Sequence, residues 1–153
     1  MLKLKNFLIY FIGTGAGSGY APFAPGTAGS FVGLLVFYLL PVSPEAWLGI
    51  ITFVFFVGVW TSTEIEKNHG TDPGLVVIDE VAGIWISLIY LPKTIPVFIL
   101  GFLLFRIFDI WKPAPANRAQ NLKAGWGIMI DDVIAGVYSN ILLQIIVYTG
   151  ILG

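Results

Sequence analysis

Cysteine is absent from this chain, and histidine occurs once, as His69. Without cysteine there can be no disulfide, no thiolate nucleophile and no cysteine-based zinc site. A single histidine excludes mechanisms that need a pair. Charge is scarce as well, since 11% of the 153 residues are charged against about 25% in an average soluble domain. The formal net charge of −1 gives no reason to expect nucleic acid as a partner.

Apolar residues are abundant instead. They make up 57% of the chain, and the mean hydropathy is +0.88. This composition is typical of an integral membrane protein in a lipid bilayer, and the length predicts one domain, residues 1–153. A spanning helix needs about 20 residues. The apolar stretches of this chain are shorter than that. They therefore form either short, protein-covered spans around a recessed site, which we favour, or a bundle embedded mostly in one leaflet. They cover approximately residues 30–40, 46–60, 81–91, 96–108 and 133–146.

The N-terminal segment could be mistaken for a signal peptide. Lys3 and Lys5 precede apolar residues 7–12, a run shorter than the roughly 7–15 residues of a signal core. We interpret it as a retained short helix that lies at the membrane interface or against the bundle. The predicted fold is therefore all-α: a small polytopic helical membrane bundle with about four spanning helices and a short N-terminal interfacial helix.

Two short proline-containing turns, residues 41–44 and 91–96, each predict an antiparallel helical hairpin. Four crossings with these turns on one face, the turn face, bring residues 13–30, 61–80 and 109–132 together on the opposite face, the motif face. The basic residues lie mostly on the motif face, so the positive-inside rule places that face in the cytoplasm. The turn face has only Lys93, whereas the motif face has Lys67, Arg106, Lys112, Arg118 and Lys123.

Gly29 and Gly33 form a pair of small residues four positions apart. Such a pair permits close helix contact, either inside one chain or between the chains of a homo-oligomer. We favour packing inside one chain.

Acidic side chains are few, yet most of them lie in three clusters where apolar stretches begin or end. A carboxylate inside a membrane costs about 2.5–3.5 kcal/mol, so such clusters mark candidate sites. Carboxylates without thiols or imidazoles suit a hard cation such as Mg²⁺. The clusters are Asp79–Glu80, Asp109 and Asp131–Asp132.

Two of these clusters also have a structural interpretation. Asp79 and Glu80 stand at the expected start of a helix, where the helix dipole favours carboxylates, although their place at the edge of the apolar zone favours metal ligation. Asp131 and Asp132 are expected to open the last span. Adjacent carboxylates repel, so both stay ionised only beside a cation or several N–H donors. Double acidic capping is the alternative.

Basic residues accompany the third cluster. Arg106 and Asp109 are three positions apart and share a helical face, which Lys112 continues. Arg106 and Asp109 form either an ion pair whose opposite charges neutralise each other, so that both side chains can be buried, or part of a site. In such a site Asp109 binds a metal while Arg106 or Lys112 holds phosphate oxygens.

A glycine-rich segment precedes the first apolar stretch but matches neither nucleotide-binding glycine motif. Gly26 and Thr27 directly precede the apolar run, and the N–H groups of a helix that starts there can bind a phosphate. Thr27 or Ser30 is suited to the N-cap, and the alternative is an ordinary capped helix. His69 is expected to lie solvated in a loop.

Four sequence blocks in order resemble the phosphatidylglycerophosphatase A family, over about residue 10 to the end of the chain. They are residues 22–30, Asp72–Pro73 with Asp79–Glu80 and Gly83, residues 105–113 and residues 127–136. The resemblance implies an all-helical enzyme of the bacterial inner membrane that acts in phospholipid biosynthesis. Its reaction is the Mg²⁺-dependent hydrolysis of the terminal phosphate of phosphatidylglycerophosphate, giving phosphatidylglycerol and inorganic phosphate.

The resemblance also raises particular residues to site candidates. It implies metal-binding or catalytic roles for the acidic residues, and phosphate contacts for Arg106 and Lys112 beside Gly26, Thr27 and Ser30. The acidic residues are Asp79, Glu80, Asp109, Asp131 and Asp132. The pattern leaves open whether water attacks phosphorus directly or an aspartyl-phosphate forms first, and the absence of D-x-D-x-T favours direct attack.

Two other classes use grouped membrane carboxylates. A CDP-alcohol phosphotransferase would carry D-G-x-x-A-R followed by G-x-x-x-D, which is absent here. A small cation carrier would not need Arg106 and Lys112 beside its acids. Release of phosphate from a lipid distinguishes the phosphatase from both.

Overall fold

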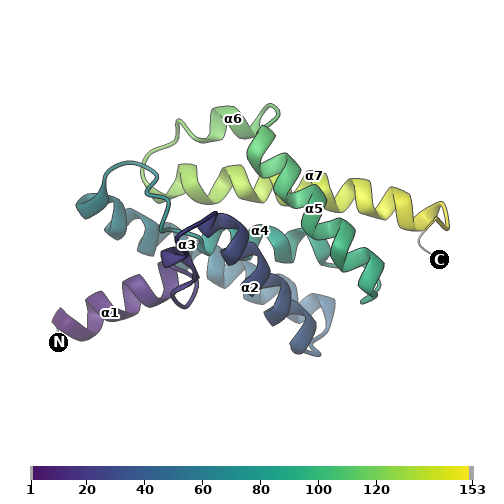
Figure 1. The fold of residues 1–153 in the computed structure, drawn as a ribbon, viewed down its shortest axis with the longest axis horizontal. Helices are drawn as coiled ribbons and strands as arrows, with labels where there is room; N and C mark the ends of the chain where they lie inside the picture. Colours follow the sequence, from purple (N-terminus) through teal and green to yellow (C-terminus); the bar gives the residue numbers. More distant parts are fainter. Residues whose placement is uncertain (1, 152–153) are drawn as a thin grey trace.

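The computed structural model describes residues 2–151, and within them every regular element is helical (Figure 1). This confirms the all-α prediction. The elements are α1 Leu2–Gly13, the 3₁₀ helix η1 Ser18–Tyr20, α2 Pro25–Leu39, α3 Pro44–His69, α4 Ile78–Leu88, α5 Ile95–Trp111, α6 Ala116–Ala119 and α7 Gly125–Tyr148.

Among the helices of residues 2–151, α3 and α7 are the two that are long and apolar enough to cross a membrane, with 26 and 24 residues. Helix α2 is apolar but has 15 residues, and α4 has 11. At 1.5 Å per residue α4 is only about 17 Å long, well short of a hydrocarbon core of about 30 Å. The presence of apolar spanning candidates supports a membrane protein, and four spanning helices stay a prediction.

The short helix α4 lies at the centre of the bundle, in contact with α2, α3, α5 and α7. All but two of its residues, Glu80 and Ile86, are buried. Small residues let its neighbours approach closely. A Cβ on Gly33 of α2 would lie 2.5 Å from Ile84 Cγ2, and the carbonyl of Gly33 accepts a 2.8 Å hydrogen bond from Trp85 Nε1.

Gly29, one turn before Gly33, contacts the residue that precedes α4. A Cβ on Gly29 would lie 2.6 Å from Val77 Cβ. Both glycines therefore serve close packing inside one chain, which confirms the favoured alternative for this pair.

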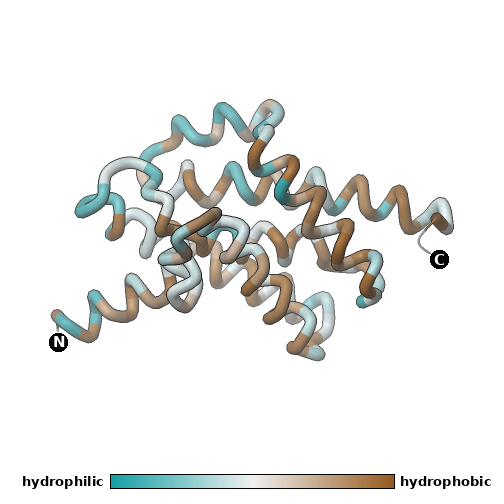
Figure 2. The backbone as a smooth tube through the Cα atoms, viewed as in Figure 1, coloured by the Kyte–Doolittle hydropathy of each residue, from teal (hydrophilic) through white to brown (hydrophobic). Residues whose placement is uncertain are grey.

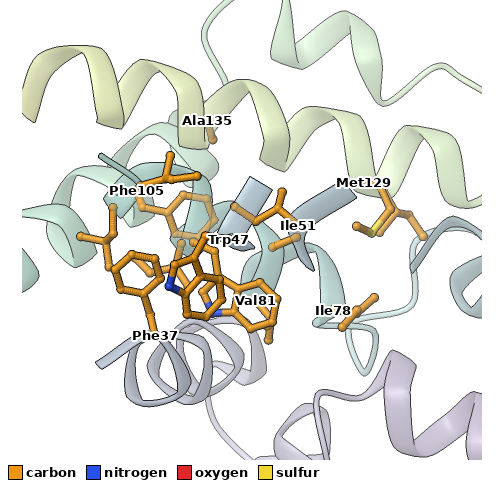
Figure 3. Packing of buried hydrophobic residues seen from close by; sticks show 14 of the residues in the cluster. Phe37, Trp47, Ile51, Ile78, Val81, Phe105, Met129 and Ala135 are labelled. Atoms are coloured by element: carbon orange, nitrogen blue, oxygen red, sulfur yellow. The ribbon is translucent and has the colours of Figure 1, made fainter. Parts of the chain in front are cut away.

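An aromatic cluster fixes the helices at the turn face (Figure 3). The ring of Trp47 stacks on Phe37 with centroids 4.5 Å apart and lies 5.1 Å from Trp85. These side chains come from the end of α2, the start of α3 and the second half of α4. Large-ring packing of this kind is rigid, so it holds these helices in register while their opposite ends carry polar residues.

Helix α3 is longer than its apolar stretch predicts. Ser43 caps its start, with Oγ accepting from Ala46 N at 3.2 Å, and the helix ends at Gly70, which adopts φ 85°. The last turns are helical because Thr61 and Ile65 are buried, and a Cβ on Gly13 of α1 would meet both side chains. Residues 61–69 are therefore helix, and the loop expected over 61–80 is confined to 70–77.

The structure also contradicts the predicted starts of two helices, α2 and α7. Helix α2 is preceded by Ala24, with no side-chain cap, and Thr27 lies inside the helix. Ser30 also lies inside and donates a 2.9 Å hydrogen bond to the carbonyl of Gly26. Helix α7 begins at Gly125, so Asp131 and Asp132 lie about two turns inside it rather than opening it.

The N-terminal helix α1 packs on α3 and projects from the bundle (Figure 1). His69 at the end of α3 is exposed, as expected, although it ends a helix rather than lying in a loop. Its Nδ1 lies 3.3 Å from the hydroxyl of Tyr10 in α1. The prediction of a short N-terminal helix is confirmed, and its place at a membrane interface stays a prediction.

Candidate active site

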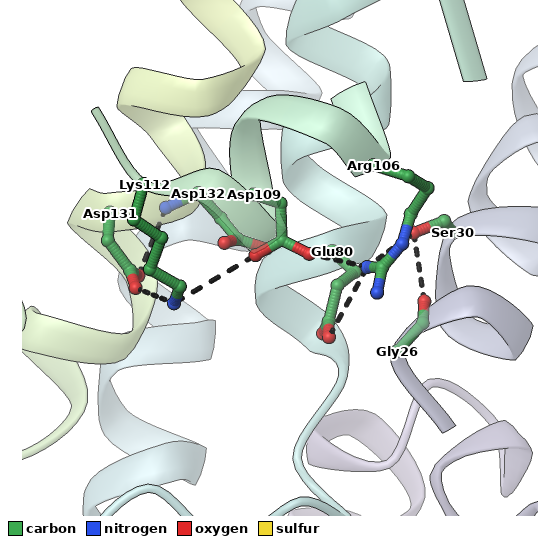
Figure 4. A network of polar contacts seen from close by, with 8 residues as sticks. All are labelled: Gly26, Ser30, Glu80, Arg106, Asp109, Lys112, Asp131 and Asp132. Carbon is green, nitrogen blue, oxygen red and sulfur yellow. Dashed lines mark hydrogen bonds and ion pairs between the residues drawn. The ribbon is translucent and has the colours of Figure 1, made fainter. Parts of the chain in front are cut away.

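Charged side chains from three helices meet at the motif face (Figure 4). They come from the first turn of α4, the last two turns of α5 and the early turns of α7, with the start of α2 beside them. The hydrophilic stretches of the chain, the end of α3, the loop after it and α6, lie towards the same end of the molecule (Figure 2). The predicted gathering of distant motifs on one face is therefore confirmed.

Three carboxylates form the centre of this site. Oxygens of Asp79, Glu80 and Asp132 all lie within 4.8 Å of one another. One oxygen of each is buried, and no residue within 2–151 donates a hydrogen bond to it. Like charges at this spacing repel strongly in a medium of low dielectric constant. Hard oxygen ligands without a protein partner are what a Mg²⁺ site requires, so this arrangement fits the ion.

The two other acids stand beside this trio with basic partners. Asp109 accepts from Arg106 Nη1 at 2.6 Å, and Asp131 accepts from Lys112 Nζ at 2.5 Å. Figure 4 places the carboxylate of Asp132 next to that of Asp109. The structure thus brings all five predicted acids together. It divides them into a trio in which each carboxylate keeps one oxygen without a hydrogen-bond partner among residues 2–151, and two acids held in short ion pairs.

Arg106 links the acidic cluster to the start of α2. Its Nη1 lies 3.9 Å from Glu80 Oε1 and 3.4 Å from Ser30 Oγ, and its Nε is buried with no acceptor among the described residues. Gly26 makes this contact possible, because a Cβ there would lie 3.2 Å from both terminal nitrogens of Arg106 and collide with Glu80. A planar guanidinium with a free donor is suited to binding a phosphate.

Lys112 is the first residue after α5, and the end of that helix sets its position. It adopts a left-handed backbone conformation, φ 48°, directly after the helix. Its ammonium lies 2.5 Å from Asp131 and 3.9 Å from Asp109, so it bridges α5 and α7. Burial opposes the charged form, but the adjacent carboxylate of Asp131 outweighs it and raises the pKa of Lys112 above its ordinary value. Lys112 therefore remains a cation at neutral pH.

Two of the three predicted phosphate-binding residues of α2 lie beside the site. Gly26 and Ser30 adjoin Arg106, whereas no described hydrogen bond joins the side chain of Thr27 to the site. The first helical hydrogen bond of α2 runs from Ala28 N to Ala24 O at 3.1 Å. The N–H groups of Gly26 and Thr27 precede it, and such groups at a helix start are available to an anion.

A small polar pocket is lined in part by Asp131. Glu66 and Gln120 line it together with Asp72, whose backbone N–H donates to Glu66 Oε1 at 2.9 Å. The sequence motifs did not indicate Glu66 or Gln120, because both lie outside the apolar stretches and the quoted blocks. A contact between the last turn of α3 and the loop after it is the feature that places Glu66 here.

Comparison with known proteins identifies a family to which this chain is similar. The profile of the family described as Phosphatidylglycerophosphatase A matches residues 11–147. A Bacteroides thetaiotaomicron protein provisionally named as a phosphatidylinositol-3-phosphatase is 42% identical over 153 residues, covering 94% of this chain and 96% of its own length.

Two relatives carry the family's name. The phosphatidylglycerophosphatase A of Escherichia coli is 37% identical over 149 residues, covering 95% of this chain and 86% of its own length. That of Haemophilus influenzae is 37% identical over 147 residues, covering 92% and 89%. No significant match is found among solved structures. An all-helical chain with this site and these relatives belongs to the phosphatidylglycerophosphatase A family of membrane phosphatases.

Proposed function

We propose that this chain is a Mg²⁺-dependent enzyme of phospholipid biosynthesis. It hydrolyses the terminal phosphate of phosphatidylglycerophosphate to give phosphatidylglycerol and inorganic phosphate. The family and its two named relatives support the substrate. The observation that carries the metal requirement is a set of three mutually close carboxylates, each with one buried oxygen that has no hydrogen-bond partner among residues 2–151, beside Arg106 and Lys112.

Asp79, Glu80 and Asp132 would hold the cation. Bound there, Mg²⁺ would supply positive charge that polarises phosphoryl oxygens and favours the ionisation of water. The chain itself supplies further charge from two sides, because Arg106 and Lys112 flank the acidic cluster in Figure 4. Their cationic groups bind the oxygens of the phosphate and stabilise the charge that develops on them in the transition state.

The two ion-paired acids have separate tasks in this proposal. Asp109 stands next to Asp132 and is held by Arg106, so it can accept the proton of the attacking water. The water oxygen bonds to phosphorus and the bond from phosphorus to the lipid oxygen breaks. The lipid oxygen takes up the proton that Asp109 accepted, and the lipid leaves as its alcohol. Asp131 orients Lys112 from the neighbouring helix.

A second lipid headgroup is a specific alternative. The relative provisionally named as a phosphatidylinositol-3-phosphatase is more identical to this chain than either named phosphatidylglycerophosphatase. Both substrates are phosphomonoesters carried by a glycerophospholipid, so the phosphate site described above serves either one. Headgroup choice then depends on the groups around the phosphate.

The deciding experiment is phosphate release by the purified protein in detergent micelles. Phosphatidylglycerophosphate and phosphatidylinositol 3-phosphate are compared, each with Mg²⁺ and with EDTA. We expect Mg²⁺-dependent release from phosphatidylglycerophosphate that EDTA stops. Preferential release from the inositol lipid would transfer the proposal to the alternative substrate. No release from either lipid by folded protein would refute the phosphatase reaction.

We further propose that the protein is multi-pass in the bacterial inner membrane, with α2, α3, α5 and α7 as four lipid-facing helices around the buried helix α4, which carries the chain from the motif face back to the turn face. Large exposed apolar side chains support this, because each of the four helices carries at least three. No residue of α4 is among the large exposed apolar residues of the described chain. Examples are Phe31, Phe53, Ile99 and Ile141.

The same proposal places the site at the cytoplasmic surface. The support is the excess of basic residues on the motif face. Because the chain has no cysteine, single cysteines can report the orientation. Thr94→Cys on the turn face should react with an impermeant maleimide only from outside the cell membrane, and Lys123→Cys only from the cytoplasm. The reverse pattern would overturn the orientation.

A further inference from the structure

An apolar groove runs along the outside of the bundle between α5 and α7. Its volume is about 330 Å³, within the size range of small-ligand sites. Phe108 and Trp111 of α5 form one wall, and Tyr138, Ile141 and Ile145 of α7 form the other. Ile141 is 54% exposed and Ile145 is 55% exposed, so the groove opens towards the surroundings of the bundle.

One end of this groove adjoins the active site. Phe108 and Trp111 directly precede Asp109 and Lys112, so the same turns of α5 present rings to the groove and charges to the site. From Tyr138 the other wall continues along α7 towards Ile145, about 10 Å farther from the site. The groove therefore extends from the phosphate-binding end of the bundle into its apolar part.

Hydrogen bonding and ring packing hold this end of the groove in shape. The hydroxyl of Tyr138 donates to the carbonyl of Ala114 at 2.7 Å, which ties the segment after Lys112 to α7. The rings of Phe108 and Tyr138 lie 5.7 Å apart, and those of Phe108 and Trp111 lie 6.4 Å apart. The groove thus reaches Trp111 and Pro113, the two neighbours of Lys112, whose ammonium faces the acidic cluster.

Two other apolar grooves lack this combination. The groove between α2 and α5, lined by Leu35 and Ile99, contains the start of α5 and so lies towards the turn face. The groove lined by Phe55 and Val133 approaches the acidic cluster, but the charged residue next to its lining in the sequence is an acid, Asp132. Among these three grooves of residues 2–151, the α5–α7 groove is the one whose lining residues directly flank a cationic residue of the site, Lys112.

We propose that the α5–α7 groove binds an acyl chain of the lipid substrate and so presents the phosphate to Lys112 and Arg106. This inference rests on the proposed lipid phosphatase function. Lipid tails in the bilayer are already apolar, so transfer of the chain gives little free energy by itself. The advantage is orientation, since a seated chain limits where the headgroup can lie relative to the reacting groups.

The test fills the groove and compares substrates with and without chains. Ile141→Trp is matched by Ile99→Trp in the α2–α5 groove, because the two isoleucines are 54% and 57% exposed. We expect Ile141→Trp to lower kcat/KM for dioleoyl phosphatidylglycerophosphate about tenfold or more, consistent with the cost of misplacing a substrate. Its effect on the deacylated headgroup substrate should stay within about twofold, and Ile99→Trp should change neither rate.

Equal effects of Ile141→Trp on both substrates, or an equal loss in Ile99→Trp, would overturn the proposal. A second measurement does not depend on turnover. In EDTA, phosphatidylglycerophosphate with a photoreactive diazirine on one chain should label the α7 segment 138–145 more than other lipid-facing segments. Unlabelled phosphatidylglycerophosphate should compete, whereas phosphatidylcholine should not.

Uniform labelling, or competition by both lipids, would refute the groove as the acyl-chain site. Absence of activity in the unmodified protein would instead refute the proposed reaction. The labelling would then still decide whether this groove binds a lipid phosphate.

Discussion

The ammonium of Lys112 lies 2.5 Å from a carboxylate oxygen of Asp131, a residue 19 positions later on a different helix. The Lys112 side chain is 26% exposed and that of Asp131 is 4% exposed. The ion pair thus joins the end of α5 to the early part of α7 at the edge of the carboxylate trio.

Removal of the ammonium should affect stability and substrate binding together. Lys112→Met leaves the Asp131 carboxylate buried without its partner, which should lower the free energy of unfolding by about 1–3 kcal/mol. The double variant Lys112→Met/Asp131→Asn should regain most of that loss, because no charge remains unpaired. Both variants should show a raised KM for the lipid. Thermal unfolding in detergent and phosphate release measure the two effects, and additive stability changes would contradict the pairing.

The trio of carboxylates predicts an opposite effect on stability. Asp132→Asn removes one of three mutually repelling charges, so in EDTA the variant should unfold at a higher temperature than the unmodified protein. Mg²⁺ should stabilise the unmodified protein and have little effect on the variant, whose phosphatase activity should fall by at least about a thousandfold.

Glu45→Gln is the matched control for this experiment. Glu45 is an exposed acid in the first turn of α3, on the turn face. Its substitution should change neither the Mg²⁺-induced stabilisation nor the activity. If Asp132→Asn kept its response to Mg²⁺, the trio would not be the metal site.

Local chemistry predicted much of the bundle from the sequence. The turns at 41–44 and 91–96 join helices as expected, and Asp79 and Glu80 lie in the first turn of α4. The length of α3 was not predictable from hydropathy. Its last turns bury Thr61 and Ile65 against Gly13 of α1, a contact that hydropathy along α3 does not contain.

The position of the last helix start was missed for a similar reason. The sequence predicted that Asp131 and Asp132 open the last span, but the helix includes Gly125, where a Cβ would collide with the carbonyl of Val59 in α3. Its N–H donates to Thr63 Oγ1 at 3.1 Å. Glycine thus permits close approach of α7 to α3, and the helix can begin about two turns before Asp131.

The composition of the site was predictable, but its internal division was not. Charge pattern identified the five acids and their two basic neighbours. The partners of each acid depend on the angles between helices. The spacing of residues along one helix gives no information on these angles. Arg106 meets Asp109 within its own helix, as the spacing of three residues predicts, whereas Lys112 pairs most closely with Asp131 across helices.

Arg106 should not be replaceable by another cation. Arg106→Lys keeps the charge but loses the planar fork that reaches Asp109, Glu80 and Ser30. We expect kcat/KM to fall by about a hundredfold, with kcat contributing to the loss because the interaction strengthens in the transition state. Steady-state phosphate release measures it. Arg118→Lys, at an exposed position of α6, is the control and should leave the kinetics unchanged.

Gly83 links the packing of the bundle to the geometry of the site. A Cβ at this position would collide with the ring of Phe105 and lie 3.1 Å from the backbone oxygen of Asp132. Gly83→Ala should therefore lower the free energy of unfolding by about 1–3 kcal/mol. It should also lower activity, because Phe105 directly precedes Arg106 in α5 and Asp132 is one of the charged residues of α7. Gly49→Ala, in a helix with open space around the glycine, should be neutral or stabilising by up to about 1 kcal/mol. Thermal unfolding and phosphate release on the two variants separate close packing from a general effect of glycine replacement, and equal behaviour of the two would contradict a role for Gly83 in packing.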